Sequence, residues 1–530
     1  MLESARKFES YTLRIELCKD KLDVTDTYDR TKTVFDNFQR AVCLYQNKKF
    51  VGDRIFDPGT QKFGGYEWRT YKEAGELVQH VGCGLKYIFR EYLPRKDAAA
   101  LYRGQEPVGI YALNRSEWLL FELSAFHSRR YSMALYDTLG ADSLEYIVNH
   151  AEIQAVFCSI DKVLRLLIMS KKLPQLKAII SIDSFDKRAA NPQALPFTVN
   201  STRVLEAWVA DKGMEQFDFE QVVKIGRTNP ADPNPLTEED LCTIGYTGGT
   251  TGTPKDAMST HRNCTAGPCS SSLATYSPGE RVILSLLPLA HTYDRATEYR
   301  NMLLGGSAGI LHIIEDTQVL QPAIFPAVSH LFIRIYDRIA VATIHAPGIR
   351  DVIAHRAVND KLEALSRGEG FRHALRDRIV FHKVWAILGG RVEVMNTGSA
   401  PLDPQVMQFL RITFNHNFSE DYAQTENSST AIISAIGDCR PGRVCIPMPD
   451  VENKLYGVPE MKYFATDKPC PRGEIMARNE IVFAGYFRDP EKTKEVLTEE
   501  GWLLTGDIGR FNEDGTISII DHVKNIFKLS

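Results

Sequence analysis

The stretch "VGIYALNRSEWLLFELSAFHSRRYSMALY", Val108–Tyr136, places two short apolar runs on either side of a longer, mostly apolar segment. Runs of this length predict strands over Val108–Leu113 and Tyr131–Tyr136, and the segment between them predicts a helix over Ser116–His127. A strand, a helix and a second strand at this spacing are typical of two parallel strands joined by a crossover helix. The stretch therefore predicts an α/β fold built on a parallel sheet.

The same alternation continues along the chain. Asp142 and Glu145 stand in the D-x-x-E form of a capping box, which predicts a helix that runs to about Ala151. Further strands are expected over 155–160 and 176–182, with a helix over 163–169 between them, and the alternation resumes over 282–397. After Gly437, short β-type runs lie between glycines and prolines. We expect an N-terminal segment 1–50, an α/β core over 51–436 with two parallel-sheet subdomains, and a smaller, mostly β subdomain over 437–520.

Size and composition limit the classes of function. The chain has 530 residues, which corresponds to roughly three or four domain-sized units. Its net charge of -4 gives no basic excess, so we expect no nucleic-acid partner. The ten cysteines show no metal-binding spacing and are expected as free thiols of a reducing, cytoplasmic compartment. The longest apolar run, Met302–Ile314, is short and glycine-rich, and is expected as a buried strand with its turn.

A loop rich in glycine and threonine, "GYTGGTTGTPKD", follows a predicted strand over Leu241–Thr247. Phosphate oxygens favour backbone N–H groups, hydroxyls and a cation, and glycines let the backbone approach an anion closely. The nucleotide loop G-x-x-x-x-G-K-[ST] does not match, because Pro254 precedes Lys255 and Asp256 follows it. A flexible surface loop is the alternative. The candidate phosphate ligands are Thr247, Gly248, Gly249, Thr250, Thr251, Gly252, Thr253 and Lys255.

This loop resembles the signature of the acyl-adenylate-forming enzymes. Four further blocks are similar to that family in the same order: "LPLAHTYDR" (Leu287–Arg295), "NTGSAPLD" (Asn396–Asp403), "DYAQTENS" (Asp421–Ser428) and "GWLLTGDIGRFNEDG" (Gly501–Gly515). The stretches Gly65–Glu73, Tyr136–Glu152 and Ile519–Ser530 resemble the long-chain fatty acyl-CoA synthetases within it. The resemblance implies a large N-terminal adenylation domain and covers roughly residues 45–530.

The resemblance also implies roles for individual residues. The loop and Lys255 would surround the triphosphate of ATP, and Glu426 would bind Mg²⁺ with Thr250 as a second ligand. Thr425 would contact the α-phosphate, Tyr422 would stack on adenine, and His291 would line the acyl pocket near the reacting carboxylate. The remaining nucleotide contacts implied are Gly398, Ser399, Ala400, Asp421, Asp507 and His522, of which Asp507 would bind the ribose hydroxyls. Lys255, Thr425, Glu426 and His291 are the implied catalytic residues.

The implied reaction joins a long-chain fatty acid to coenzyme A with ATP and Mg²⁺. The carboxylate attacks the α-phosphorus to give acyl-AMP and pyrophosphate, and the thiol of CoA then displaces AMP. No covalent enzyme intermediate is needed, so no cysteine is assigned a nucleophilic role. Relatives of this kind also suggest peripheral association with an intracellular membrane.

Three departures from the family pattern leave a second hypothesis open. Asp256 places a carboxylate after the loop lysine, which weakens ATP binding if it points inward and does little if it points outward. His522 stands where an arginine is usual, so a fixed positive charge is lost. Residues 521–530, with Lys524, resemble the start of the hinge to a small C-terminal domain of that family, so we expect either that the sequence is part of a longer protein or that the protein lacks this domain. The alternative to a ligase is therefore a non-catalytic paralogue that binds a nucleotide or an acyl ligand.

Overall fold

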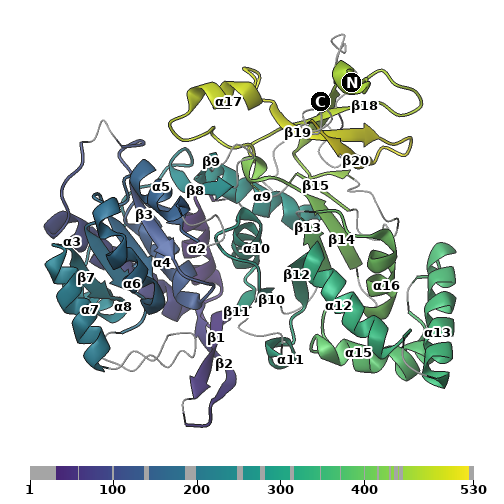
Figure 1. Ribbon diagram of the computed structural model, residues 1–530, viewed down its shortest axis with the longest axis horizontal. Coiled ribbons are helices and arrows are strands. Elements are labelled where there is room, and N and C mark those ends of the chain that lie inside the picture. The colour runs from purple at the N-terminus through teal and green to yellow at the C-terminus, as the bar shows by residue number, and fades with distance from the viewer. Residues whose placement is uncertain are drawn as a thin grey trace.

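The computed structural model describes most of the residues of the chain. They are Leu13, 31–57, 59–97, 101–136, 142–184, 199–247, 255–274, 281–310, 315–345, 348–370, 372–398, 400–414, 417–428, 431–434, 440 and 446–523. They form two α/β lobes side by side, with a smaller β sheet above the junction of the lobes (Figure 1).

The first lobe is built on a seven-stranded sheet in the order β7-β6-β5-β3-β4-β8-β9. All neighbours are parallel except β8 and β9, which form an antiparallel pair at one edge. The strands are β3 (Glu106–Tyr111), β4 (Arg130–Ala134), β5 (Ala155–Cys158), β6 (Ala178–Ser181), β7 (Glu215–Asp218), β8 (Leu241–Thr247) and β9 (Lys255–Thr260). The helices are α3 (Tyr71–Glu91), α4 (Ser116–His127), α5 (Ser143–His150), α6 (Ile160–Ile168), α7 (Val199–Asp211) and α8 (Phe219–Thr228), with a 3₁₀ turn at Ser170–Lys172.

The second lobe has a nine-stranded mixed sheet in the order β16-β15-β14-β13-β12-β10-β11-β1-β2. Its first two strands come from the start of the chain, β1 (Lys49–Asp57) and β2 (Lys62–Thr70). The others are β10 (Val282–Ser285), β11 (Ser307–Ile310), β12 (Ile324–Val328), β13 (Val394–Gly398), β14 (Asn417–Tyr422), β15 (Ile432–Ile433) and β16 (Ile446–Pro447).

Helices surround this second sheet and cover its junction with the first lobe. They are α2 (Val34–Leu44), α9 (His261–Ala274), α10 (Thr292–Leu303), α11 (Asp316–Leu320), α12 (Ser329–Ala342), α13 (Ile349–Ser366), α14 (Ala374–Arg376), a π-helical turn at Asp377–Phe381, α15 (His382–Ile387) and α16 (Pro404–Phe414). The small antiparallel sheet contains β17 (Glu452–Tyr456), β18 (Arg472–Arg478), β19 (Leu503–Phe511) and β20 (Ile517–His522), with a 3₁₀ turn at Pro459–Met461 and α17 (Pro490–Val496) beside it.

The predicted fold class is confirmed. The helix α4 has the predicted bounds. It is apolar on all sides because eleven of its twelve residues are buried, some against the first lobe and some against the second. The strand β8 also has its predicted bounds. The small sheet spans residues 452–522, while β16 still belongs to the second lobe, and the domain limits at 50, 436 and 520 stay predictions.

Two local predictions are wrong in detail. The helix α5 forms, but the side chain of Asp142 makes no capping hydrogen bond, and Glu145 instead accepts a hydrogen bond from Lys172 at 2.8 Å. The run Met302–Ile314 begins as the last turn of α10, and its strand is limited to β11, while residues 311–314 lie outside the described part. Among the described helices, none has the length and apolar character needed to cross a membrane.

Candidate active site

The antiparallel pair β8–β9 fixes the two ends of the predicted phosphate loop. Thr247 at the end of β8 is in register with Lys255 at the start of β9. The residues between them, including Gly248, Gly249, Thr250, Thr251, Gly252 and Thr253, lie outside the described residues, as do Ser399 and Lys524. The structure therefore shows where the loop leaves and re-enters the sheet, and its contacts with phosphate stay a prediction.

Lys255 lies beside a tyrosine and a glutamate from two distant parts of the chain. Its Nζ donates a hydrogen bond to the Tyr486 hydroxyl at 3.2 Å and lies 3.9 Å from Oε1 of Glu426. The same hydroxyl donates to Oε1 of Glu426 at 2.7 Å. Burial and the neighbouring Glu426 raise the pKa of Tyr486 well above its usual value, so the hydroxyl keeps its proton at neutral pH. A cation and a carboxylate are thus held at a fixed spacing by one phenol.

The segment containing Tyr486 is attached to β9 by its backbone. Met258 N donates to Gly485 O at 2.9 Å, and Ala484 N donates to Met258 O at 2.9 Å. Phe487 N donates to Asp256 O, and Phe483 N donates to the backbone carbonyl of Glu426. Residues 483–487 therefore join the edge strand of the first lobe to the turn that carries Glu426.

Asp256 points to the other side of β9 from Lys255, as successive residues of a strand do. Its Oδ2 lies 3.4 Å from Nδ1 of His150 on α5, and its side chain is buried beside Tyr246, its register partner on β8. Burial raises the pKa of Asp256 to about 6, and burial lowers the pKa of His150. The carboxyl of Asp256 thus faces α5, on the opposite side of β9 from the Lys255 side chain.

Thr425 and Glu426 lie on the 3₁₀ turn Thr425–Asn427, which packs on the end of β8. A Cβ added at Gly245 would lie 2.9 Å from the Thr425 methyl group, so the close approach requires glycine at this point of the strand. The turn is capped by Gln424, whose backbone N–H donates to Asn427 Oδ1 at 2.7 Å. Thr425 is thereby held beside the strand that leads into the loop.

Asp507 contacts two other predicted nucleotide residues, Tyr422 and His522, at the small sheet, together with Gln424. Its Oδ2 accepts hydrogen bonds from the Tyr422 hydroxyl at 2.7 Å and from the Gln424 side chain at 2.6 Å. His522 pairs with Asp507 across β19 and β20, and its Nε2 lies 3.8 Å from Oδ1 of Asp507. Burial and the charge of Asp507 raise the pKa of Tyr422, so its hydroxyl remains a donor. One oxygen of Asp507 is thus occupied by the protein, and the other faces His522.

Gly398 and Asp421 are adjacent at the ends of β13 and β14. A Cβ at Gly398 would lie 3.3 Å from the backbone oxygen of Asp421. The side chain of Asp421 accepts hydrogen bonds from the Tyr293 hydroxyl at 3.1 Å and from Ser419 at 3.2 Å. Burial raises the pKa of Asp421 to about 6. Ala400 is turned toward α12, where its carbonyl accepts a hydrogen bond from Ser329 at 2.5 Å.

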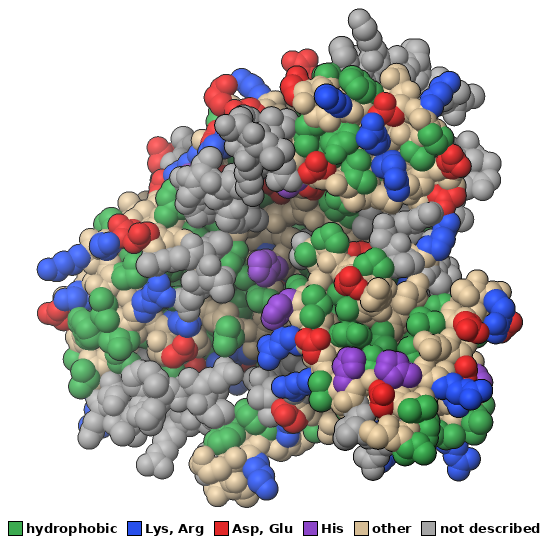
Figure 2. Space-filling model, turned by 45° about the vertical axis from the view of Figure 1, so that its right-hand side comes forward, with side chains coloured by type: hydrophobic (Ala, Val, Ile, Leu, Met, Phe, Trp, Pro, Cys, Tyr) green, Lys and Arg blue, Asp and Glu red, His purple; other side chains and the backbone are tan. Residues whose placement is uncertain are grey.

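His291 is the residue before the first turn of α10. Its side chain is exposed, and its ring lies 5.7 Å from the ring of Tyr136. The next residue, Thr292, places its methyl group 3.9 Å from an added Cβ at Gly245. His291 therefore lies near the end of β8, on the side of the first lobe. Figure 2 shows that the surface is hollowed between the lobes and that histidine side chains lie in this hollow.

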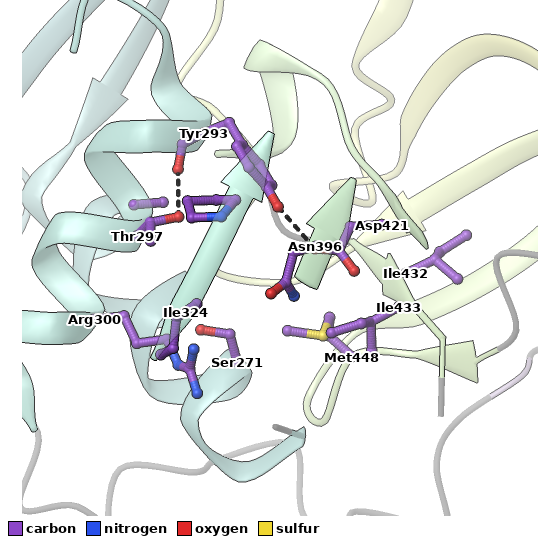
Figure 3. A pocket seen from close by; sticks show the side chains of 12 residues that line it. Ser271, Tyr293, Thr297, Arg300, Ile324, Asn396, Asp421, Ile432, Ile433 and Met448 are labelled. Atoms are coloured by element: carbon purple, nitrogen blue, oxygen red, sulfur yellow. Dashed lines mark hydrogen bonds between the residues drawn. The ribbon is translucent and has the colours of Figure 1, made fainter. Parts of the chain in front are cut away.

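A cavity of about 50 Å³ lies against α10, between α9 and the strands of the second lobe (Figure 3). Its wall combines apolar side chains with several polar ones. The lining residues are Ser271, Tyr293, Ala296, Thr297, Arg300, Ile324, Pro326, Asn396, Asp421, Ile432, Ile433 and Met448.

Asp421, predicted as a nucleotide contact, directs its side chain into this cavity. Tyr486, Gln424 and the polar residues of the cavity other than Asp421 were not predicted from the sequence. Gln424 lies inside the quoted block Asp421–Ser428 and could have been found there. The sequence around Tyr486 has no pattern that predicts a functional residue, apart from the glycine before it. Its contacts come from chain segments far away in the sequence.

The chain is similar to known enzymes along almost its whole length. The family of AMP-binding enzymes matches residues 46–487. Long chain acyl-CoA synthetase 6, peroxisomal, of Arabidopsis thaliana is 37% identical over 94% of this chain and 67% of that protein. Long-chain-fatty-acid–CoA ligase 1 of Homo sapiens is 35% identical over 95% of this chain and 68% of its own length. The chain thus spans about two thirds of the length of these relatives.

Solved structures share the fold at lower identity. The adenylation domain of a carboxylate reductase from Mycobacterium chelonae matches with a TM-score of 0.73 and 20% identity, covering 95% of this chain and 73% of that one. A long-chain-fatty-acid-CoA ligase from Archaeoglobus fulgidus matches with a TM-score of 0.66 and 16% identity, covering 94% and 86%. The sequence matches and the shared fold lead to one conclusion: the chain belongs to the family of AMP-binding enzymes.

Proposed function

We propose that the chain activates a long-chain fatty acid with ATP, first to acyl-AMP and then to acyl-CoA. The observation that carries the proposal is the arrangement of Lys255, Glu426, Tyr422 and Asp507, from three separate segments: Lys255 lies beside Glu426 where the glycine-threonine loop re-enters the sheet, and Tyr422 is bonded to Asp507. Relatives named as long-chain acyl-CoA synthetases or ligases are 35% to 38% identical to the chain. Nothing in these relatives favours the non-catalytic alternative.

The nucleotide would lie between the small sheet and the ends of β13 and β14. Tyr422 presents a ring whose hydroxyl is fixed by Asp507, and an aromatic face held in this way suits a purine base. Asp507 and His522 lie beside each other where ribose hydroxyls would bind. Gly398, Ser399 and Ala400 would flank the base with their backbone.

The phosphates would lie against the loop, Lys255 and Thr425. The first step transfers the adenylyl group: a carboxylate oxygen bonds to the α-phosphorus as the bond to the pyrophosphate oxygen breaks. Catalysis of such a step is mostly positioning and neutralisation of charge. Lys255 supplies a cation whose position is fixed through Tyr486. In the second step the CoA thiol loses its proton, its sulfur bonds to the acyl carbon, and AMP leaves.

Glu426 is the residue that would hold Mg²⁺ with the phosphates. Magnesium commonly takes one or two carboxylates together with substrate phosphates, and a single half-buried glutamate beside the loop fits this pattern. Among the described residues no cluster of three or more metal-ligating side chains exists, so the phosphates and the loop would supply the other ligands. When bound, the ion neutralises charge on the phosphate oxygens.

The acyl chain would occupy the cavity along α10, with His291 near the reacting carboxylate. The cavity is lined by both branched and unbranched apolar side chains that can contact an alkyl chain. Met448 is well suited to do so, because methionine is unbranched and adapts its shape. For location we propose the cytoplasm, at the surface of an intracellular membrane. Some relatives are named peroxisomal, which makes the peroxisome the alternative.

The proposal is tested by mass-spectrometric detection of acyl-AMP and acyl-CoA. The chain is incubated with Mg·ATP, CoA and fatty acids from C8 to C18, and a non-hydrolysable acyl-adenylate mimic is added to a parallel sample for thermal unfolding. We expect both products and a raised Tm with the mimic. Lys255→Met should lower acyl-AMP formation about 100-fold, by analogy with the loss of a charged contact to a transition state.

The matched control is Lys494→Met, which removes an exposed lysine of α17 and should leave the rate unchanged. Binding of the mimic without any acyl-AMP would overturn the catalytic proposal and leave a binding protein. The absence of both products and of any Tm shift would overturn the nucleotide site as well.

A further inference from the structure

A helical segment on the outside of the second lobe carries apolar side chains on two opposite faces. The segment consists of α14, the π-helical turn and α15, and it runs without a break over residues 374–387. Its inner face packs into the core of the lobe through Phe381, which is completely buried. On its outer face, Leu375, Ile379 and Ile387 are 57%, 58% and 41% exposed. The core of the lobe therefore does not account for these three side chains.

The charged residues of the outer face are basic. Arg378 and Lys383 are exposed, and His382 is exposed beside them. Residues 372–391 contain five basic residues and one acidic residue, although the net charge of the whole chain is -4. Every fourth residue from 375 to 387 is exposed, a spacing that follows one side of a helix. We call this face the basic apolar stripe, and it consists of Leu375, Arg378, Ile379, His382, Lys383 and Ile387.

The nearest carboxylates are used inside the lobe and do not neutralise the stripe. Asp377, the acidic residue of the segment, is buried and accepts a hydrogen bond from Lys361 of α13. Asp360 of α13 binds Arg376. Within the part of the chain that the structure describes, Arg378 and Lys383 form no ion pair. Their positive charges therefore face outward beside the exposed leucine and isoleucines.

The stripe is held in a fixed position by hydrogen bonds to two neighbouring helices. Trp385 donates from its indole nitrogen to the carbonyl of Thr413 on α16 at 2.5 Å. Thr317 on α11 donates from its hydroxyl to the carbonyl of Ile387 at 3.1 Å. Figure 1 shows α15 at the end of the second lobe opposite the small sheet. A partner bound to the stripe therefore leaves the small sheet, which carries Asp507, uncovered.

A lipid surface matches both properties of the stripe. Helices that lie in the plane of a membrane interface bury an apolar face at the boundary of headgroups and acyl chains, and their lysines and arginines interact with anionic lipids. The long stems of Arg378 and Lys383 can follow the apolar surface while their charges stay among the headgroups. A protein partner would need carboxylates at fixed matching positions, whereas lipid headgroups rearrange around the cations.

We propose that the basic apolar stripe docks the chain on a bilayer that contains anionic phospholipid. Leu375, Ile379 and Ile387 enter the interface, and Arg378 and Lys383 bind the negatively charged headgroups. The inference rests on the proposed function for the place of the chain at a membrane, and it adds the surface that makes the contact and the charge of the lipid.

The test measures partition of the chain onto vesicles by co-sedimentation, without ATP or fatty acid. Vesicles of phosphatidylcholine alone are compared with vesicles in which about one third of the lipid is phosphatidylglycerol. We expect partition onto the anionic vesicles to be at least about 10-fold greater, because each basic residue near an anionic surface contributes a factor of about five. High salt should reduce the difference, since it screens these charges.

Two variants of the stripe separate its charges from its apolar side chains. Arg378→Glu/Lys383→Glu should lower partition onto anionic vesicles about 30-fold. Leu375→Ser/Ile379→Ser should lower it about 10-fold, because less apolar surface leaves water on docking. Both variants change exposed side chains, so their Tm should stay close to that of the unaltered chain.

Ile168→Ser/Lys171→Glu is the matched control from the first lobe. Ile168 at the end of α6 is 65% exposed, and Lys171 three residues later is an exposed cation. Its partition should equal that of the unaltered chain. Equal partition onto both kinds of vesicle, or partition unchanged in both stripe variants, would overturn the inference. A dimer in sedimentation velocity that both stripe variants dissociate, without vesicle binding, would overturn it in favour of a second copy of the chain.

A parallel assay separates this inference from the proposed function. Acyl-CoA formation is measured with fatty acid dispersed in detergent, where no bilayer is present, and both stripe variants should be as active as the unaltered chain. Vesicle binding without product from any acid would support the docking surface and overturn the enzyme. Product formation without binding to either kind of vesicle would support the enzyme and overturn the docking surface.

Discussion

Asp256 shows how much the direction of one side chain decides. From the sequence it could have weakened phosphate binding, but its carboxyl faces His150 on the far side of β9 from Lys255. The alternation of side chains along a strand separates the two neighbours. The effect of Asp256 is therefore expected on stability, through burial of a carboxyl whose pKa is raised to about 6.

Asp256→Asn should stabilise the protein at neutral pH. The pKa of Asp256 is raised from 3.8 to about 6, so the folded state favours the protonated form. The stabilisation of the folded state by the protonated carboxyl is fully present below about pH 4 and is lost as the pH rises through 6. This loss lowers the free energy of unfolding by up to about 3 kcal/mol at pH 7. The Tm of Asp256→Asn should exceed that of the unaltered chain at pH 7 and approach it near pH 4.5.

The control for this experiment is Asp337→Asn, which changes an exposed carboxyl on α12. Its Tm should follow that of the unaltered chain at every pH. A Tm difference between Asp256→Asn and the unaltered chain that stays constant from pH 4.5 to 7.5 would contradict the assigned titration.

Among the helices, two similar sequence patterns have different outcomes. Thr70 and Glu73 form a complete capping box at the start of α3, whereas Asp142 and Glu145 form none at α5. The backbone explains the difference. Thr70 is extended, with φ -73° and ψ 163°, and Asp142 is helical, with φ -92° and ψ -7°. A capping side chain reaches the third N–H from an extended backbone, and the pattern of residues alone does not reveal that conformation.

The contact between β8 and the turn of Thr425 predicts a defect that can be repaired. Gly245→Ala would place a Cβ 2.9 Å from the Thr425 methyl group, so the turn must shift. We expect acyl-AMP formation to fall about 10-fold, since a small displacement of a catalytic group costs rate, while the Tm falls only slightly. The rate is measured by release of pyrophosphate.

The double variant Gly245→Ala/Thr425→Ser tests the cause. Serine keeps the hydroxyl of Thr425 and lacks the methyl group that meets the new Cβ, so a large part of the lost rate should return. Gly65→Ala is the control, because an added Cβ there meets nothing within 4 Å. If the double variant is as slow as Gly245→Ala, the rate depends on the geometry of the strand itself and not on the contact with the methyl group.

In the whole molecule, local patterns predicted the kinds of element but not their partners. The α/β alternation and the position of β8 followed from runs of a few residues. The pairing of β1 with β11 joins residues near 51 to residues near 308, and no local pattern encodes that distance. The site is similar: sequence blocks identified Lys255 and Glu426, while the phenol of Tyr486 between them depends on how segments 483–487 and β9 meet.

The two lobes share a buried polar contact at their junction. Glu122 lies on α4 of the first lobe, and Arg295 lies on α10 of the second, with their nearest charged atoms 3.5 Å apart. Glu122 also accepts hydrogen bonds from Tyr299 of α10 at 2.7 Å and from Ser132 of β4 at 2.5 Å. Both charged side chains are almost completely buried. The helix that lines the proposed acyl cavity is thus fixed to the first lobe through its opposite face.

Removing one member of this pair should destabilise the protein more than replacing both. Arg295→Met leaves the charge of Glu122 buried without its cation, a change that costs about 3–5 kcal/mol in comparable pairs. A chain of this size need not unfold in one step, so the first calorimetric transition is the quantity to measure. We expect its Tm to fall by about 5–10 °C. In Arg295→Met/Glu122→Gln, the amide oxygen can accept from one of the hydroxyls of Tyr299 and Ser132 and the amide NH2 can donate to the other, without any charge, and more than half of the loss should return. A double variant less stable than Arg295→Met would mean that the charge of Glu122 is compensated by its two hydroxyl donors, and that Arg295 acts at the junction only through its packing.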